Sequence, residues 1–132
     1  MNSKLGNAII VGLQVLMSLA FMGSGAMKIM TPYEALKANP GMEWANDFSA
    51  TAIVGIGSVE LLLALGLLLS LFLSSLKKYT AVFAAGLAVV MVGAAITHLS
   101  RGEQIVPNAV FFVLTGAIAW VRKDRLTSPK SH

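Results

Sequence analysis

The sequence contains no cysteine and few charged residues. The lack of cysteine excludes disulfides, thiol redox chemistry, thiolate metal sites and thioester chemistry. Charged residues make up 12% of the chain, whereas a soluble domain has about 25%, so they are too few to cover a water-facing surface. The sequence also lacks a Walker loop, a GxGxxG turn after a strand and an HExxH helix. These absences exclude several common nucleotide and metalloprotease sites.

The chain is rich instead in apolar residues, gathered in four long blocks. Hydrophobic residues make up 56% of the 132 residues, and the mean hydropathy is +0.76. A helix that crosses a bilayer needs about 20 mainly apolar residues, and in lipid the backbone must satisfy its own hydrogen bonds. We therefore predict an all-α membrane protein with one domain, whose helices cover about 5–28, 48–76, 79–99 and 105–122, followed by a polar tail over 123–132.

Short connections join the second, third and fourth predicted helices, which makes them antiparallel neighbours. The expected architecture is an antiparallel four-helix transmembrane bundle. Small residues such as Gly25 and Gly57 would let helices approach closely. A secretory signal peptide is the competing interpretation of the first block, but three further spans follow it and its apolar run is long for such a peptide.

The positions of the basic residues predict the orientation. Three basic residues, Lys28, Lys37 and Arg101, share one side of the predicted bundle with four acids. The other side collects seven basic residues: Lys4, Lys77, Lys78, Arg122, Lys123, Arg125 and Lys130. The positive-inside rule places that second side, with both termini, in the cytoplasm, and we expect a multi-pass protein of the cell inner membrane. The net charge of +4 thus reports topology rather than a nucleic-acid partner.

Glu60 is the one acid inside an apolar run, GSVELLLALGLLLSL. At about 1.5 Å per helical residue, counted from Lys77 and Lys78, it lies roughly 25 Å from the cytoplasmic boundary. Counted in the same way from the cytoplasmic end of each helix, Asn108, His98 and Lys28 lie roughly 21, 30 and 36 Å from that boundary. A lone charge in hydrocarbon costs about 2.5 kcal/mol or more, so an intramembrane acid faces the bundle interior and finds a partner.

The candidate partners of Glu60 form the predicted buried polar site. This site consists of Lys28, Glu60, Thr97, His98 and Asn108. Four of these residues also have a purely structural interpretation: Lys28 and Glu60 as an ion pair that fixes helix register, His98 as an interfacial residue, and Asn108 as a cap after Pro107. We assign no catalytic residue, because no nucleophile accompanies Glu60. We assign no metal site, because His98 and Glu60 are too few ligands for a structural zinc, and the second histidine, His132, lies in the tail.

Three segments resemble the DoxX-like family. FMGSGAMKIMTP (21–32) resembles the end of that family's first helix, with Gly25 three residues before Lys28. GSVELLLALGLLL (57–69) is similar to its second helix, with the glutamate at Glu60, and GAAITHLSRGE (93–103) to the end of its third. The resemblance implies a small four-helix membrane protein. Members include a thiosulfate:quinone oxidoreductase subunit, relatives in oxidative-stress complexes, and an endoplasmic-reticulum chaperone for nicotinic acetylcholine receptors, so kinship does not transfer one activity.

Three functions follow as hypotheses. The first is a non-enzymatic accessory subunit or assembly factor with an outward-facing polar pocket around Glu60, which contacts the lipid bilayer and another membrane protein or a second copy of itself. The second is a quinone-linked oxidoreductase subunit, in which the pocket holds a quinone head group and Glu60 or His98 handles protons. The third is a carrier of protons or small molecules. A cavity beside Glu60 would favour binding, whereas a dry ion pair would favour a structural role.

Overall fold

A computed structural model describes residues 3–127 of the chain, and every described element is helical. The long helices are α1 (Ser3–Met30), α3 (Ala50–Leu69), α5 (Thr80–Ser100) and α6 (Val106–Arg122). The short ones are α2 (Tyr33–Ala38), α4 (Ser74–Lys77) and the 3-10 helices η1 (Glu43–Asp47) and η2 (Lys123–Leu126). Predicted tail residues such as Lys130 and His132 lie outside the described range.

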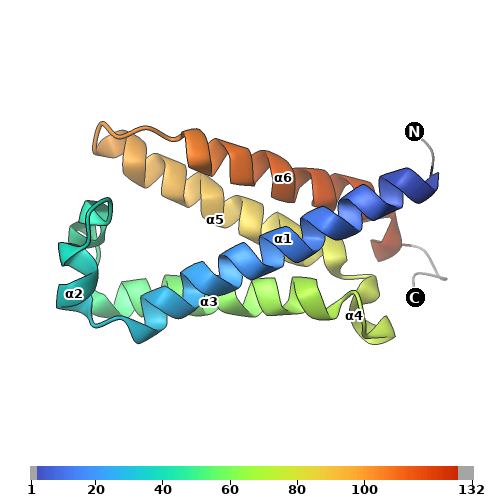
Figure 1. The fold of residues 1–132 in the computed structure, drawn as a ribbon, viewed down its shortest axis with the longest axis horizontal. Coiled ribbons are helices and arrows are strands. Elements are labelled where there is room, and N and C mark those ends of the chain that lie inside the picture. The colour runs from blue at the N-terminus through green and yellow to red at the C-terminus, as the bar shows by residue number, and fades with distance from the viewer. Residues whose placement is uncertain (1–2, 128–132) are drawn as a thin grey trace.

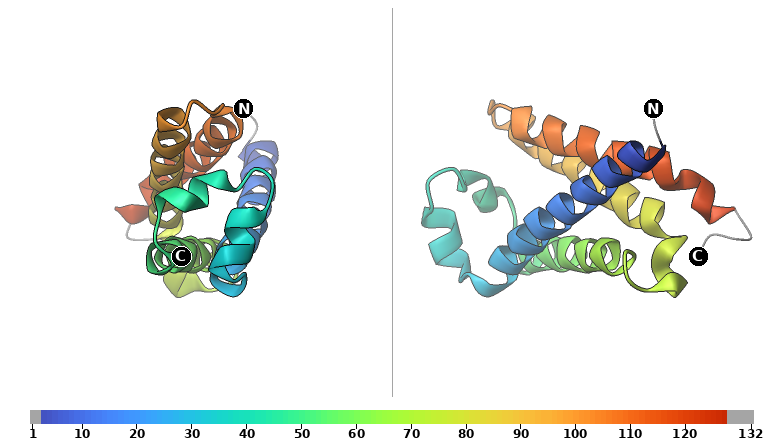
Figure 2. Two further views of the ribbon diagram at one scale, coloured as in Figure 1. Left: turned by 90° about the vertical axis from the view of Figure 1, so that its left-hand side faces the viewer. Right: turned by 45° about the vertical axis from the view of Figure 1, so that its right-hand side comes forward.

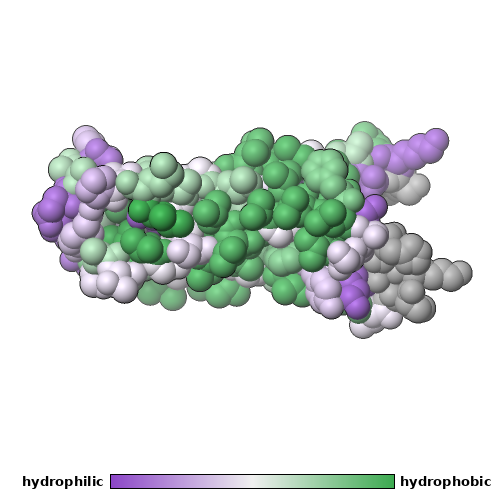
Figure 3. Space-filling view, turned by 90° about the horizontal axis from the view of Figure 1, so that it is seen from below, coloured by the Kyte–Doolittle hydropathy of each residue, from purple (hydrophilic) through white to green (hydrophobic). Residues whose placement is uncertain are grey.

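Three of the described helices, α1, α3 and α5, are long and apolar enough to cross a membrane. Large apolar side chains stay exposed along them, for example Leu62 at 67% and Val89 at 69%. The surface in Figure 3 has a broad hydrophobic middle, and hydrophilic residues gather toward its two ends. A lipid-facing exterior explains this distribution, because in a bilayer exposed leucine and valine contact hydrocarbon.

The long helices associate as two pairs. Helix α1 packs on α3, and α5 packs on α6; smaller contacts between α3 and α5 and between α1 and α6 join the pairs (Figure 1). The start of α1 and η2 lie at one end of the molecule, which we call the terminal end. Residues 31–49, with α2 and η1, lie at the other end and form a cap segment between α1 and α3 (Figure 2).

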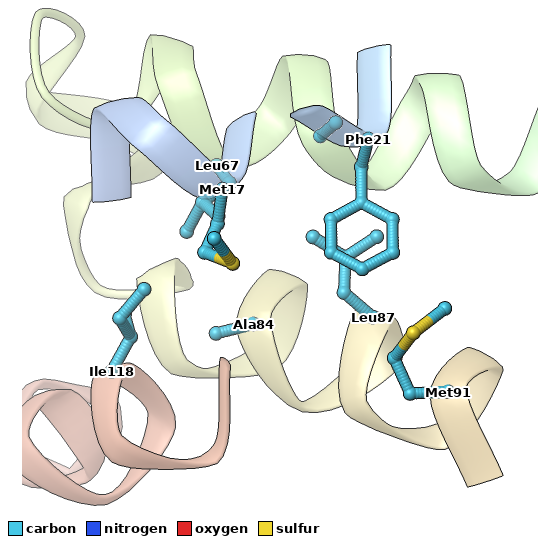
Figure 4. Close-up of a cluster of buried hydrophobic side chains, with 8 residues drawn as sticks. Met17, Phe21, Leu67, Ala84, Leu87, Met91 and Ile118 are labelled. Carbon is cyan, nitrogen blue, oxygen red and sulfur yellow. The ribbon is translucent and has the colours of Figure 1, made fainter. Parts of the chain in front are cut away.

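The main core lies between the two pairs. Met17 and Phe21 of α1 meet Leu67 of α3, and these contact side chains of α5 and α6 (Figure 4). The buried cluster comprises Met17, Phe21, Ala64, Leu67, Ala84, Leu87, Met91 and Ile118. A second, smaller cluster of Leu36, Ala45 and Ile53 holds the cap segment on α3. The cap segment is therefore a packed structure rather than the polar loop that its composition indicates.

The helix predicted over 48–76 is shorter in the structure. It ends at Leu69, and the chain turns at residues 70–73 before the single turn of α4. At this point Ser70 Oγ donates to Leu67 O at 2.7 Å, and Gln14 Nε2 of α1 donates to the same carbonyl at 2.7 Å and to Ser70 Oγ at 2.8 Å. Two of these bonds satisfy the carbonyl group of Leu67, which a continuing helix would use. The depth of Glu60 cannot then be counted from Lys77, and Glu60 lies halfway along α3.

Candidate functional site

The candidate site begins where α1 and α3 come closest. A Cβ atom placed on Gly25 would lie 2.6 Å from Gly57 O, and one on Gly57 would lie 2.7 Å from Lys28 Cβ. Neither position has room for a side chain, so the two backbones touch there, as the small-residue pattern predicts. Lys28 and Glu60 each follow one of these glycines by three residues, nearly one helical turn. The close approach therefore places their side chains opposite each other.

Lys28 and Glu60 form a buried ion pair. Lys28 Nζ lies 2.8 Å from Glu60 Oε1, and the two residues are only 9% and 2% exposed. Ser24, one turn before Lys28, accepts a hydrogen bond from Lys28 Nζ at 2.6 Å, and its hydroxyl lies 3.3 and 3.4 Å from the two carboxylate oxygens. A buried ion pair is tolerated when further hydrogen bonds satisfy its remaining atoms. Ser24 supplies part of that satisfaction.

The pair retains unused hydrogen-bonding capacity. An ammonium group has three N–H donors, and among the described residues Lys28 donates two, to Ser24 and Glu60. Its Nζ also lies 5.6 Å from the centre of the Trp44 ring. Glu60 Oε2 receives only the long 3.4 Å contact from Ser24 in the same part of the chain. One donor and one strong acceptor thus remain for another molecule.

This capacity faces a cavity of about 870 Å³ between the two helix pairs. Lys28, Glu60, Thr97, His98 and Asn108 all line it, so the structure brings the five predicted site residues to one space. Most of the remaining wall is apolar. Phe21 and Phe111, in edge-to-face contact at 5.7 Å, lie on the wall contributed by α1 and α6, and Trp44 and Phe48 of the cap segment also line it. Concave, largely apolar spaces with a few convergent polar groups are typical ligand sites.

Of the four candidate partners of Glu60, Lys28 contacts it, and the other three residues have contacts elsewhere. His98 Nδ1 lies 2.7 Å from Glu103 Oε1, and Thr97 Oγ1 donates to Gly93 O at 3.0 Å. Asn108 Nδ2 lies 4.0 Å from Met91 Sδ, a weak acceptor. The physical reason is the separation of the helix pairs: Glu60 is on α3 in one pair, while these three residues are on α5 and α6 in the other.

A chain of polar contacts joins the cap segment to the end of α5. Arg101 Nη1 lies 3.0 Å from Asp47 Oδ1, and Arg101 Nε lies 3.3 Å from Glu103 Oε2. The hydrogen bond with His98, more than those with Arg101, lowers the pKa of Glu103 below its usual value, against the opposing effect of desolvation. Because the carboxylate form of Glu103 is favoured, His98 Nδ1 acts as the donor and its Nε2 is left for a second contact. The Trp44 ring, 6.5 Å from that of His98, lies alongside this chain of contacts.

Sequence reasoning missed two residues of the site. Ser24 precedes Lys28 by four residues, so helical periodicity places both on one face, and this signal could have identified it. Trp44 lines the cavity between Lys28 and His98. No local pattern indicates this position, because it depends on how the cap segment folds back over the helices.

The comparison with protein families gives one finding. The model of the DoxX-like family matches residues 12–121, which include α3, α5, the cap segment, nearly all of α6 and most of α1. No curated protein and no solved structure matched the chain.

Proposed function

The chain belongs to the DoxX-like family, and from this premise we propose that it is a non-enzymatic accessory or assembly subunit of a membrane, which binds a small, largely apolar molecule beside Glu60. One observation carries the proposal: the Lys28–Glu60 pair opens onto a cavity of about 870 Å³. An ion pair that only fixes helix register needs no cavity beside it. Ligand sites commonly enclose about 300–1,000 Å³.

The side of the membrane that the cavity faces depends on which helices cross the bilayer. We infer that α6, although only 17 residues long, crosses the membrane with α1, α3 and α5, which completes an antiparallel four-helix bundle. The basic residues near the terminal end, among them Lys77, Lys78 and Arg122, favour a cytoplasmic position for both termini in a cell inner membrane. The cap segment and the pocket then face outward.

Mild-detergent purification followed by mass spectrometry tests the proposal. We expect a small amphiphile, with or without a partner protein, to co-purify with the chain, and its amount to fall at least tenfold in Glu60→Gln, which removes the charge that holds Lys28 in place. Lys37→Gln is the matched control, because Lys37 lies outside the cavity and pairs with the exposed Glu34. Equal retention by Glu60→Gln would overturn the proposal, and so would rapid quinone oxidation or reduction by the purified chain alone.

A quinone-linked redox subunit is the second candidate. The observation that favours it is that Glu60 and His98, two groups able to exchange protons, line the same cavity. It predicts that a quinone analogue raises the melting temperature of the protein and that Glu60→Gln abolishes the rise. Absence of any shift with quinones of different head groups would exclude this candidate and leave the first in place.

A further inference from the structure

Helices α3 and α5 pack tightly toward the terminal end. A Cβ atom on Gly66 would lie 2.6 Å from the Phe83 ring, and one on Gly86 would lie 2.9 Å from Leu63. The later residue of α3 meets the earlier residue of α5, so the two helices run antiparallel at this contact. The stripe of α3 that includes Leu63 and Gly66 is therefore the one that faces α5.

The same two stripes separate toward the cap segment. If the antiparallel pairing of Gly66 with Phe83 and of Leu63 with Gly86 continued along both helices, Gly55 would lie level with Ala94, and Ile56 with Gly93. These residues line the cavity instead of touching one another. The cavity-lining residues of these stripes include Ala52, Gly55, Ile56 and Val59 on α3 and Val90, Gly93, Ala94 and Thr97 on α5.

Two glycines occupy the middle of this separation. A Cβ atom on Gly55 or on Gly93 would meet no atom within 4 Å. Both residues are exposed, and they adjoin the lipid-facing Val54 and Val92, which are 42% and 44% exposed. Helices α3 and α5 are both membrane-capable. Gly55 and Gly93 thus form what we call the window, an opening of the cavity toward the hydrocarbon of the bilayer.

The polar end of the cavity selects the head group of the ligand. Lys28 and Glu60 neutralise each other, so a charged head would leave one charge uncompensated in a largely apolar space. The remaining Lys28 donor and the Glu60 Oε2 acceptor match a group that both accepts and donates a hydrogen bond, which a hydroxyl does. The apolar stripes of the window match a hydrocarbon chain.

We propose that the cavity takes up an uncharged, hydroxyl-bearing single-chain amphiphile directly from the bilayer, through the window between α3 and α5. This inference rests on the proposed function and adds the class of ligand and its route. The hydroxyl group lies between Lys28 and Glu60, and the chain extends through the window, past Gly55 and Gly93, into lipid. The molecule never has to cross the cap segment.

Tryptophan fluorescence in vesicles tests the route. The chain has two tryptophans: Trp44 lines the cavity, whereas Trp120 is 70% exposed on α6. In Trp120→Phe, Trp44 alone reports entry of a monoacylglycerol that carries bromine, a contact quencher, on the chain carbons next to its head group. In Trp44→Phe, Trp120 reports arrival of the same probe in the bilayer. We expect Trp44 to be quenched later and more completely than Trp120.

Leucine at the window supplies the decisive comparison. In the Trp120→Phe protein, Gly55→Leu combined with Gly93→Leu narrows the opening at two positions where an added Cβ meets no atom within 4 Å. We expect quenching of Trp44 to slow by roughly tenfold or more, equivalent to about 1.4 kcal/mol of barrier. Gly12→Leu is the matched control, because Gly12 is an exposed α1 glycine that also has no neighbour within 4 Å and does not line the cavity. Equal rates in the window and control variants would overturn the route.

Brominated probes with other head groups test the ligand class. We expect a lysophosphatidate and a fatty amine to bind roughly tenfold or more weaker than the monoacylglycerol. Equal affinity of either charged probe would overturn the ligand class. If no probe quenches Trp44 more than Trp120, the cavity takes up no amphiphile, and the proposed function fails with the inference. If quenching occurs but the window variants do not slow it, only the inference fails.

Discussion

At the residue scale, the Lys28–Glu60 pair is costly to keep in an apolar protein. Taking two charges out of water costs several kcal/mol per ion, and replacement of such a pair by apolar residues is often neutral or stabilising. Hydrophobic residues on α1 and α3 would hold the helices together at least as well. The presence of a charged pair beside a cavity therefore favours a role in binding over a role in stability.

A double-mutant cycle separates these two roles. Lys28→Met leaves a buried carboxylate with only Ser24 beside it, and we expect it to lower the free energy of unfolding by about 3–5 kcal/mol. Lys28→Met combined with Glu60→Leu removes both charges, and we expect the protein to recover to within about 1 kcal/mol of the original. Unfolding by denaturant in mixed micelles measures each value, and bound amphiphile is quantified in the same preparations.

The matched control for this cycle is Lys37→Met. Lys37 forms an ion pair with Glu34 at 3.3 Å, but the Glu34 side chain is 83% exposed, so we expect a loss below about 1 kcal/mol. The single variant Glu60→Leu completes the cycle. If the double variant lost as much free energy of unfolding as Lys28→Met and Glu60→Leu together, the two charges would stabilise the fold independently. A double variant that is stable but still retains ligand would show that the pair does not bind it.

The predictability of individual residues did not depend on how near their partners lie in the chain. Lys28 could be named as a partner of Glu60, because both are charged residues in apolar helices that follow one another in the chain as long helices. His98 could not be assigned correctly, since its partner Glu103 lies in the turn beyond α5 and Glu60 lies in the other helix pair. The position of Trp44 could not be predicted, because it depends on the packing of the cap segment through Leu36 and Ile53.

At the element scale, the contact between α1 and α3 tolerates no added atom at Gly57, whereas Gly55, two residues earlier, lies in open space. Gly57→Ala places a Cβ 2.7 Å from Lys28 Cβ and 2.8 Å from Gly25 O, so we expect α1 and α3 to separate and the free energy of unfolding to fall by about 1–3 kcal/mol. Gly55→Ala makes the same chemical change in the same helix without a clash. We expect it to be neutral or slightly stabilising, because alanine favours helix over glycine.

Denaturation of the two alanine variants in micelles gives this comparison directly. Equal stability of Gly57→Ala and Gly55→Ala would contradict the close approach of α1 and α3. Loss of bound ligand in Gly57→Ala alone would agree with it, since Lys28 and Glu60 depend on this contact for their alignment.

The end of α3 shows why one helix boundary was wrong. Residues 70–73, Ser-Leu-Phe-Leu, include no glycine or proline, and nothing in their apolar character indicates a turn. The turn is stabilised by Gln14, 56 residues away from Ser70 in the chain. A polar residue near the middle of the first apolar block thus determines where the second helix stops, and only the packed structure shows the connection.

At the scale of the whole molecule, the cavity results from two helix pairs that touch toward the terminal end and separate toward the cap segment. The sequence indicates the helices but not this separation. A glycine in an apolar helix can face lipid, pack between helices or line a cavity, and nothing in the sequence tells these cases apart for Gly55 and Gly93. What distinguishes them is the space beside them. The cap segment bridges the separated ends through the Asp47–Arg101 ion pair.

The orientation of the whole molecule depends on α6, which has 17 residues and is the shortest of the long helices described. If α6 crosses the bilayer, the start of α1 and the residues after α6 lie in the cytoplasm, opposite the cap segment.

The chain has no cysteine, so single cysteines can be introduced without background. In inverted vesicles, we expect Ser3→Cys and Thr127→Cys to react with a membrane-impermeant maleimide from outside, and Glu43→Cys to react only after the vesicles are opened. Intact cells should give the reverse pattern. Reaction of Thr127→Cys on the same side as Glu43→Cys would show that α6 does not cross, because three spans place the two ends of the chain on opposite sides of the membrane. That outcome would place Arg122, Lys123 and Arg125 on the same side as the cap segment, contrary to the positive-inside rule.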